Sequence, residues 1–356
     1  MSGVLEEIKE RLEAGEAIDR EQALWLLTGA ELLSLGKLAH AQRLERHPEG
    51  RVTYVIDRNV NYTNVCTSKC RFCAFFREAE ADDAYLLDYE AIYAKVAELV
   101  EHGGTQLLMQ GGLHPDLQIE WYEALFRELK QRFPQVQVHS LSPAEVIHIA
   151  EVSGLTMRTC LERLQAAGLD SVPGGGAEVL VDKVREEISP NKIGWRRWAE
   201  VMETAHELGM RTTATMMFGS RERPEDIVEH LFRVREIQQR TGGFTAFIPW
   251  TFQPDNTELG GETASGVEYL RVLALSRLVL DNIDNVQASW VTQGAHMAQV
   301  ALFFGANDLG GTMLEENVVA AAGCSFRLSE EEIRDIVRGA GFEPAKRDTL
   351  YRILEG

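Results

Sequence analysis

Short apolar segments alternate with amphipathic segments along most of this chain, and this alternation constrains the fold more than any other feature. About eight apolar runs have the composition of strands, and we expect them at 58–63, 105–109, 136–140, a run that ends at Ser171, 212–217, 244–252, 286–291 and 308–309. Helical periodicity lies between them, as at Ile92, Val96 and Leu99. Strands that alternate with helices indicate βα units and a parallel sheet. The sequence therefore predicts an α/β fold, a (β/α)8 TIM-like barrel that is full or nearly closed.

The segments on either side of this alternation predict extensions of the barrel. Asp19 and Gln22 have the spacing of a capping box before a helix, and a second helical run spans 32–44. We expect a helical extension at 1–50, the barrel at 51–310 and a C-terminal extension at 311–356 that packs on the barrel. We also expect the flanking helices to cap the barrel interior and exclude water from it.

Charge and composition exclude several classes of partner. The formal net charge is −19, from 36 basic and 55 acidic residues, which argues against nucleic acid or an anionic membrane as a partner. We find no apolar run of about 18 residues, the length that a membrane span needs. The first residues lack the basic and then apolar pattern of a signal region. We therefore expect a cytoplasmic protein whose cysteines stay reduced.

Three cysteines lie close together in the sequence. Cys66, Cys70 and Cys73 fall within eight residues, with three and then two residues between them. Three thiolates can ligate three irons of a [4Fe–4S] cube and leave the fourth iron open to another ligand. An open iron on a redox cluster suggests catalysis, so we take these three residues as the metal ligands.

Zinc is the alternative occupant of such a cluster, in a non-catalytic binding module that the metal stabilises. Structural zinc sites usually pair one C-x2–4-C with a second pair of ligands. Cys160 and Cys324 stand alone, with no histidine nearby at ligand spacing, and we expect both to be small buried side chains. An odd number of cysteines also argues against a disulfide framework.

The cysteine spacing resembles the cluster motif of the radical S-adenosylmethionine (SAM) superfamily. The resemblance implies a cofactor pair, a [4Fe–4S] cluster and SAM, in which the open iron binds the amino and carboxylate groups of the methionine portion. Gln110, Gly111 and Gly112 then stand where a Gly-Gly-Glu-type run of that superfamily meets the cofactor's amino group. Leu113 takes the place of the glutamate, so the contact would come from backbone carbonyls or from Gln110.

Other polar and apolar residues at predicted strand ends are candidates for cofactor contacts. Glu178 follows three consecutive glycines, which permit the backbone to curl closely around a ligand. Its carboxylate would meet ribose hydroxyls or the ammonium group of the cofactor; a solvated carboxylate at the start of a helix is the alternative. Lys192 is placed to meet a carboxylate. The further residues that we expect to line the cofactor site are Phe72, Ser140 and Phe218.

Longer runs narrow the resemblance to a subgroup that makes deazaflavin and menaquinone precursors. Among these runs are 103–106, 110–115, 170–178, 212–219, 244–254 and 287–292. Together they resemble the family of cyclic dehypoxanthinyl futalosine synthases of the futalosine route to menaquinone, over nearly the whole chain from Asp57 to Leu354. The resemblance implies that a 5′-deoxyadenosyl radical removes the hydrogen from C4′ of dehypoxanthine futalosine. The sugar radical then attacks the benzoate ring of the substrate and forms a C–C bond.

This reaction needs substrate contacts, a proton acceptor and an electron donor. The substrate carries a carboxylate, whereas the chain is strongly acidic, so affinity must come from local donors, for which Lys192, His114, Arg211 and His296 are candidates. The other candidates for substrate hydrogen bonds are Thr251, Gln253 and Thr292. Glu178 and His296 are the candidate catalytic residues, as acceptors of the proton that leaves the ring. A flavodoxin or ferredoxin is the expected electron donor.

Aminofutalosine synthase or a related radical SAM enzyme remains an alternative at this stage. In that enzyme the adenosyl radical adds to an enolpyruvyl double bond and stays in the product. Free 5′-deoxyadenosine among the products would therefore indicate the cyclase, and its absence would exclude it.

Overall fold

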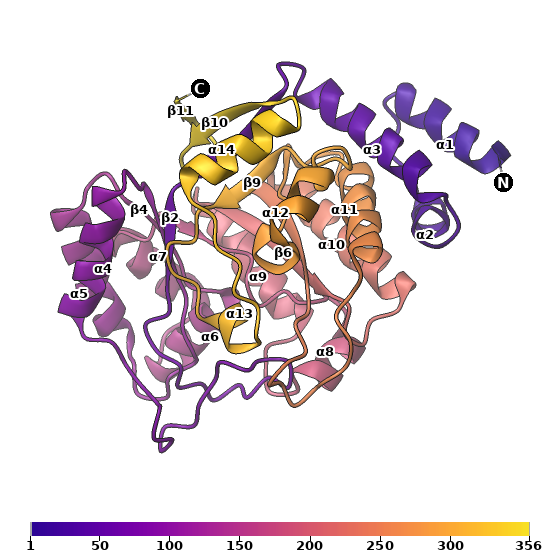
Figure 1. The fold of residues 1–356 in the computed structure, drawn as a ribbon. Helices are drawn as coiled ribbons and strands as arrows, with labels where there is room; N and C mark the ends of the chain where they lie inside the picture. The colour runs from indigo at the N-terminus through magenta and orange to yellow at the C-terminus, as the bar shows by residue number, and fades with distance from the viewer. Residues whose placement is uncertain (1, 356) are drawn as a thin grey trace.

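Seven parallel strands form the main sheet of this protein in the computed structural model, which describes residues 2–355 (Figure 1). Neighbours in the sheet are also neighbours in the sequence, as successive βα units require. The strands are β2 (Asp57–Val60), β3 (Gln106–Met109), β4 (Gln137–Ser140), β5 (Ser171–Val172), β6 (Arg211–Phe218), β7 (Phe244–Thr251) and β8 (Asn285–Val286).

An eighth position closes this sheet into a barrel. β9 (Asp308–Gly311) pairs in parallel with β1 (Arg51–Val55), which continues into β2 after a single residue. On the side toward β1, the Thr53 amide donates to the Asn307 carbonyl oxygen at 3.0 Å. On the side toward β8, the Ala288 amide donates to the Asp308 carbonyl oxygen at 2.8 Å. The predicted (β/α)8 barrel is confirmed, and hydrogen bonds run around its whole circumference.

Helices between the strands cover the outside of the barrel. They are α4 (Tyr89–Glu101), α5 (Ile119–Arg132), α6 (Pro143–Val152), α7 (Met157–Ala167), α8 (Asp182–Ile188), α9 (Trp195–Glu207), α10 (Pro224–Thr241), α11 (Gly266–Val279) and α12 (Trp290–Ala301). Local sequence sets where they start: the Asp88 side chain accepts from the Ala91 amide at the start of α4. The predicted stripe of Ile92, Val96 and Leu99 is fully buried against the sheet.

The N-terminal helices do not cap the barrel interior. α1 (Ser2–Glu13), α2 (Arg20–Thr28) and α3 (Leu32–Arg46) lie at the end of the molecule away from the loop that follows β2 (Figure 1). α2 and α3 pack against α10 and α11 on the outer surface. The predicted capping box of Asp19 and Gln22 is present at the start of α2. The expectation that these helices shield the interior is therefore wrong.

The C-terminal segment closes the barrel instead. Its elements are α13 (Val318–Ala321), α14 (Glu330–Gly339), β10 (Glu343–Arg347) and β11 (Ile353–Glu355). β10 pairs in parallel with β1, with Ala345 opposite Thr53. Arg347 and Tyr351 then line the inside of the barrel at the end where the strands begin.

Strand boundaries differ from the prediction at one place that matters for the site. The expected strand at 286–291 ends at Val286, because Trp290 begins α12. Gly294 interrupts that helix with φ 79° and ψ 166°, a conformation that favours glycine. The residues after β8 therefore turn across the end of the barrel rather than extending along it.

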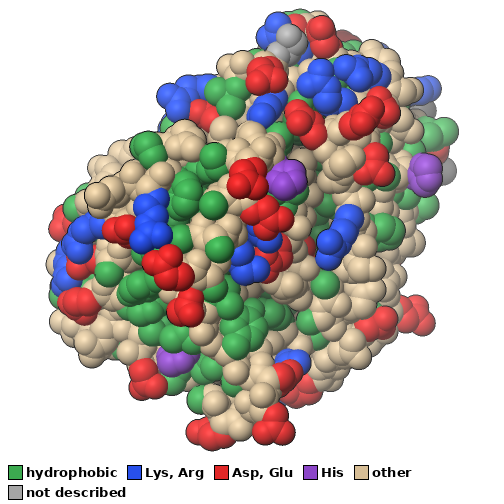
Figure 2. All heavy atoms as spheres, turned by 60° about the vertical axis from the view of Figure 1, so that its left-hand side comes forward, with side chains coloured by type: hydrophobic (Ala, Val, Ile, Leu, Met, Phe, Trp, Pro, Cys, Tyr) green, Lys and Arg blue, Asp and Glu red, His purple; other side chains and the backbone are tan. Residues whose placement is uncertain are grey.

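On the face in Figure 2, acidic and basic side chains are interspersed, and hydrophobic side chains gather below them. Within residues 2–355, none of the helices combines the length and the apolar character that crossing a membrane requires.

Candidate active site

The three cysteines lie in a loop that is held in place by the backbone around it. The loop follows β2 at the carboxyl end of the barrel, where the active sites of barrel enzymes lie. The Cys66 amide donates to the Arg77 carbonyl oxygen at 3.0 Å, and the Cys73 amide donates to the Cys70 carbonyl oxygen at 3.0 Å. The Arg77 guanidinium in turn donates to the carbonyl oxygens of residues 74, 75 and 76. The thiols thus come from a fixed loop.

The surroundings of the thiols are mostly dry. Cys70 is buried and Cys66 and Cys73 are half-buried, and all three are free thiols. Burial raises the pKa of the Cys70 thiol to about 11, and burial also raises the pKa of Cys73, which the backbone N–H groups of Phe75 and Phe76 partly oppose. A thiolate in this loop therefore needs a cation beside it.

The three thiols have the donor chemistry that an iron–sulfur cluster requires. Within residues 2–355, no group of three or more His, Cys, Asp or Glu side chains is arranged to hold one metal ion. In a cluster each thiolate binds a different iron, so the sulfurs need not meet at one point. Phe72 packs against a small apolar group of buried side chains that includes Val184, Met217 and Phe252, which supplies the apolar surroundings that tune a cluster. Cys66, Cys70 and Cys73 therefore fit a [4Fe–4S] cluster.

Gly111 and Gly112 are required by packing within the protein. A Cβ on Gly112 would lie 2.1 Å from the Val65 carbonyl oxygen, and one on Gly111 would lie 2.6 Å from the Tyr62 ring. The Gly112 amide donates to the Thr63 carbonyl oxygen at 3.0 Å. The two glycines thus allow the loop after β3 to lie directly on the cysteine loop. Their predicted contact with the cofactor remains a prediction.

Glu178 and Lys192 form part of a buried charged group. The Glu178 carboxylate lies 2.8 Å from Lys192 Nζ and 3.2 Å from an Arg185 guanidinium nitrogen. These two cations hold the pKa of Glu178 below its usual value against the effect of burial. Lys192 Nζ lies 5.5 Å from the centre of the Phe72 ring. Glu178 is therefore an ionised, paired carboxylate beside the cysteine loop, and these surroundings argue against its predicted role as a proton acceptor.

Arg185 is a residue of this group that sequence reasoning missed. Its guanidinium donates to the Gly176 carbonyl oxygen at 3.1 Å and to the Ile193 carbonyl oxygen at 2.7 Å. It therefore fixes the glycine-rich loop, in which Glu178 takes a left-handed conformation with φ 40°. A lone arginine in a helix gives no sign of this role in the sequence.

Ser140 and Phe218 lie in the wall of the barrel. The Ser140 hydroxyl donates to the Met109 carbonyl oxygen at 2.7 Å, and Phe218 stacks on Tyr269 with ring centres 6.4 Å apart. Neither side chain lines the cavity inside the barrel. The structure thus gives both residues a packing role, and their predicted cofactor contacts are not tested by it.

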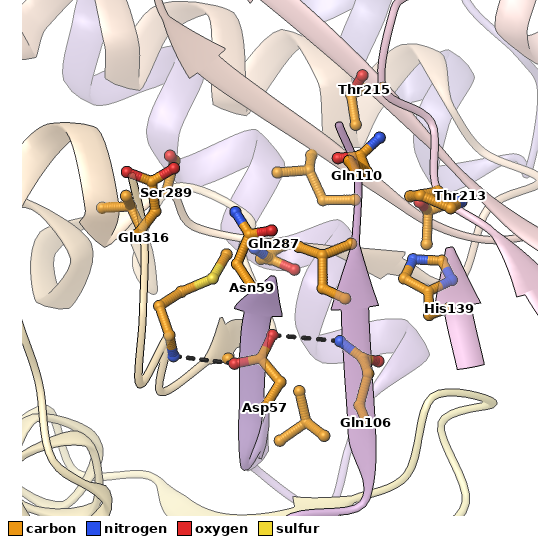
Figure 3. Close-up of a pocket in the computed structure, with 18 of the residues that line it drawn as sticks. Asp57, Asn59, Gln106, Gln110, His139, Thr213, Thr215, Gln287, Ser289 and Glu316 are labelled. Atoms are coloured by element: carbon orange, nitrogen blue, oxygen red, sulfur yellow. Dashed lines mark hydrogen bonds between the residues drawn. The ribbon is translucent and has the colours of Figure 1, made fainter. Parts of the chain in front are cut away.

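A cavity of about 260 Å³ occupies the inside of the barrel (Figure 3). Inward-facing side chains alternate along the strands, as in Asp57, Asn59 and Asn61 on and after β2. This alternation of polar residues is visible in the sequence, although none of the three was among the predicted site residues. The other lining residues are Val55, Gln106, Leu108, Gln110, His139, Pro173, Gly175, Thr213, Thr215, Ile248, Trp250, Gln287, Ser289, Val291, Thr292, Gly311, Met313, Glu316, Val318, Val319, Arg347, Thr349 and Tyr351.

The floor of the cavity is charged, and its charged side chains are buried. Arg347 makes a two-pronged ion pair with Asp308, with N–O distances of 2.6 and 2.9 Å. Asp57 accepts from the Met313 amide at 2.9 Å and from the Gln106 carboxamide at 3.3 Å (Figure 3). Burial raises the pKa of Asp57 to about 6. These residues come from β2, β3, β9 and the C-terminal segment, and sequence spacing alone does not bring them together.

The predicted substrate residues fall into two groups. Thr292 lines the cavity, and the Thr251 hydroxyl accepts from the Gln293 carboxamide at 2.6 Å beside it. Gln253 donates to the Thr251 hydroxyl at 3.0 Å and lines, with Thr292, a second cavity beside residues 322–326.

The remaining candidates do not reach the cavity. Arg211 begins β6, at the opposite end of the barrel, and donates to the Gly242 carbonyl oxygen. His296 is exposed on α12, and His114 lies in the loop after β3, where its carbonyl oxygen lies 2.8 Å from His148 Nε2. The structure thus removes Arg211 from the site and leaves His114 and His296 outside the cavity. Lys192, the fourth candidate for the substrate carboxylate, is paired with Glu178 and is not among the residues that line the cavity.

Family models match both halves of the chain. Residues 60–234 match the model of the radical SAM superfamily, and residues 241–355 match the CofH/MqnC C-terminal region. Among solved structures, the hydrogenase maturase HydG of Carboxydothermus hydrogenoformans aligns with a TM-score of 0.75 and 16% identity, over 98% of this chain and 80% of that chain. Methylornithine synthase aligns with a TM-score of 0.74 and 17% identity, over 95% and 97%. These two likenesses show the fold.

Curated relatives with two different names match almost equally well. A cyclic dehypoxanthine futalosine synthase of Halalkalibacterium halodurans is 46% identical, over 98% of this chain and 94% of the relative. A protein of the same name from Streptomyces coelicolor is also 46% identical, over 98% and 89%. A 5-amino-6-(D-ribitylamino)uracil–L-tyrosine 4-hydroxyphenyl transferase of Methanothermobacter thermautotrophicus is 45% identical, over 96% and 95%.

The fold, the cysteine loop and the matches to the family model and the relatives together define the class of this protein, which is a radical SAM enzyme. Within that superfamily, the chain belongs to the family that comprises the cyclic dehypoxanthine futalosine synthases and the related 4-hydroxyphenyl transferases.

Proposed function

We propose that this protein converts dehypoxanthine futalosine into cyclic dehypoxanthine futalosine, a step of menaquinone biosynthesis. The observation that carries this proposal is the 46% identity, over 98% of the chain, to two proteins of that name from different bacteria. The cavity inside the barrel supports it, because its walls would surround a substrate and limit the access of competing hydrogen donors to a reactive radical.

Cys66, Cys70 and Cys73 would hold the cluster in the proposed enzyme. When bound, a [4Fe–4S] cluster and SAM supply a 5′-deoxyadenosyl radical. Lys192 lies over the ring of Phe72 in the cysteine loop and is paired with Glu178, so these two residues would meet the charged groups of SAM. Arg185 would keep Glu178 in place for that contact.

The reaction joins C4′ of the sugar to a carbon of the benzoate ring. One C–H bond at C4′ and one on the ring are broken. The hydrogen atom from C4′ would go to the 5′-deoxyadenosyl radical, the proton from the ring to a carboxylate, and the electron back to the oxidised cluster. The barrel walls would hold the sugar and the ring against each other, which turns the encounter into an oriented intramolecular step. Asp57 and Glu316 line the cavity, and we propose these carboxylates as proton acceptors in place of Glu178 and His296.

Arg347 is our candidate for the substrate carboxylate. Among the described residues that line the cavity, it is the one with a permanently charged cationic side chain. Its ion pair with Asp308 fixes the guanidinium at the floor of the cavity. The benzoate would thus point to the floor, and the sugar toward the cysteine loop. Because Arg347 belongs to β10, the C-terminal extension would complete the active site of the 51–310 barrel.

The second candidate function is transfer of the 4-hydroxyphenyl group of tyrosine to 5-amino-6-(D-ribitylamino)uracil, which the 45% identity to a relative of that name supports. Incubation of the reconstituted enzyme with either substrate set separates the two functions. We expect consumption of dehypoxanthine futalosine and formation of a product two hydrogens lighter. Consumption of tyrosine and the ribityl compound instead would show that the transferase assignment is correct.

A small-molecule substrate is common to both candidates. For the proposed cyclase, a flavodoxin or ferredoxin would supply the reducing electron, and a reducing cytoplasm would protect the cluster. Each donor can be tested by its ability to replace a chemical reductant in the assay.

A further inference from the structure

Four carboxamide side chains gather in the part of the cavity nearest the cysteine loop. Asn59 and Asn61 come from β2 and its end, Gln110 follows β3, and Gln287 follows β8. Figure 3 shows the Asn59, Gln110 and Gln287 side chains directed into the cavity from different strands. We call these four residues the carboxamide cluster.

Asn61 has a polar atom that the protein leaves without a partner. Its side chain is 2% exposed, and its Nδ2 donates to the Gln110 carbonyl oxygen at 3.1 Å. Within residues 2–355, its Oδ1 has no hydrogen-bond partner. The reverse orientation of the carboxamide would set two oxygens against each other, so Oδ1 is the atom left free. A buried carbonyl oxygen without a donor is costly, and a ligand with a donor group would remove that cost.

Two glycines leave room for the two glutamine side chains of the carboxamide cluster. A Cβ on Gly175 would lie 2.4 Å from Gln110 Nε2, and a Cβ on Gly310 would lie 2.4 Å from Gln287 Nε2. Gly310 also takes a φ of 70°, which favours glycine. The backbone is thus shaped to accept both carboxamides at the cavity wall.

Another part of the cavity wall has a different chemistry. Ile248 and Trp250 of β7 line it, together with Val291, Val318 and Val319. A carboxamide offers a donor and an acceptor side by side and carries no charge, which suits the neighbouring hydroxyl groups of a polyol. An apolar, partly aromatic wall suits a flat ring.

We propose that the carboxamide cluster binds the hydroxyl groups of the sugar portion of the substrate, while the wall around Trp250 holds its aromatic ring. This inference deepens the proposed function and rests on it for the identity of the sugar. Asn61 lies five residues before Cys66, so the cluster would hold the sugar beside the place where the radical forms. It would thereby decide which C–H bond faces the radical.

Binding to two matched pairs of compounds tests the proposal on the reconstituted holoenzyme. The first pair is dehypoxanthine futalosine and 3-propanoylbenzoate, which lacks the sugar. The second pair is 5-amino-6-(D-ribitylamino)uracil and 5,6-diaminouracil, which lacks the polyol. We expect Asn61→Leu to weaken binding of the polyol-bearing member about tenfold or more, because a hydroxyl then loses its partner, and to leave the polyol-free member unchanged.

Asn282→Leu is a matched control. Asn282 likewise has a buried Oδ1 without a partner among the described residues, but its Nδ2 donates to the Arg235 carbonyl oxygen outside the cavity. This variant should bind all four compounds as the wild type does. If Asn61→Leu does not fold, Gln287→Leu repeats the comparison, with thermal melting as the check on folding.

The possible outcomes separate this inference from the proposed function. Selective loss of polyol binding in either pair supports the inference, even if the wild type turns over only the ribityl compound, an outcome that would overturn the proposed function alone. Equal weakening of both members of a pair would overturn the inference. Failure of the wild-type enzyme to bind either polyol-bearing compound would overturn it as well.

Discussion

Gly112 lies against the backbone of Val65, so that a Cβ at position 112 would come within 2.1 Å of the Val65 carbonyl oxygen. The same Cβ would lie 2.8 Å from Cβ of Cys66, the first of the three cysteines. The loop after β3 therefore acts as a support for the cysteine loop, and the support requires a residue without a side chain. This contact joins the barrel to the site where the cluster would be held.

Gly112→Ala should disturb the cysteine loop. We expect a loss of stability of about 1–3 kcal/mol, as for other overpacked sites, and less than half the wild-type iron after reconstitution. Gly3→Ala is the control, because a Cβ on Gly3, in α1, would meet no other atom within 4 Å. Wild-type iron content in Gly112→Ala would show that the cysteine loop does not depend on this support.

Replacement of Cys66, Cys70 or Cys73 by Ala should abolish reductive cleavage of SAM and remove most of the bound iron. Each of these thiols would bind a different iron, so none can take over the role of another. Cys324→Ser should keep both properties, because Cys324 lies outside the cysteine loop, where its thiol donates to the Val291 carbonyl oxygen. Product analysis and iron determination check the prediction, and turnover in any of the three alanine variants would count against it.

Asp57 should make the stability of the protein depend on pH. Burial raises its pKa from 3.8 to about 6, so the folded protein binds more protons than the unfolded chain between these values. Asp57 contributes about 3 kcal/mol to the free energy of unfolding below pH 3.8, and this contribution is lost as the pH rises through 6. Urea unfolding of Asp57→Asn should therefore show a smaller decline between about pH 4 and pH 7. The exposed Asp116→Asn should follow the wild type, and a similar course for Asp57→Asn would refute the assignment.

The ion pair between Arg347 and Asp308, at the floor of the cavity, should be essential for the stability of the protein. Both side chains are buried, and removal of one partner leaves the other charge without compensation. We expect Arg347→Met to lower the free energy of unfolding by about 3–5 kcal/mol. The double variant Arg347→Met, Asp308→Leu should recover much of this loss in chemical denaturation. A double variant as unstable as the sum of its single variants would indicate that the two charges do not act as a pair.

Local patterns were enough to predict the barrel. Alternating apolar and amphipathic segments predicted most of its strands, and the cap at Asp19 was predictable because it acts within three residues. β10 was missed, since Glu343–Arg347 has no apolar alternation and its strand partner, β1, is almost 300 residues away. Long-range pairing of this kind leaves no local signal in the sequence.

The candidate site was predictable only where its residues are close in sequence. The cysteine spacing indicated the cluster, whereas Arg347 reaches the cavity through the pairing of β10 with β1. Arg211 was a wrong candidate because it begins β6, and only the carboxyl ends of the strands face the cysteine loop. The carboxamide cluster could have been found from the alternation of Asp57, Asn59 and Asn61, which marks one face of a strand.

The measurement that tests the account most directly uses dehypoxanthine futalosine with deuterium at C4′. The enzyme is reconstituted without oxygen, reduced and incubated with SAM, and the 5′-deoxyadenosine is analysed by mass spectrometry. We expect one deuterium in the 5′-deoxyadenosine for each molecule of cyclic product. Formation of the cyclic product with unlabelled 5′-deoxyadenosine, or with the adenosyl group retained in the product, would contradict the account.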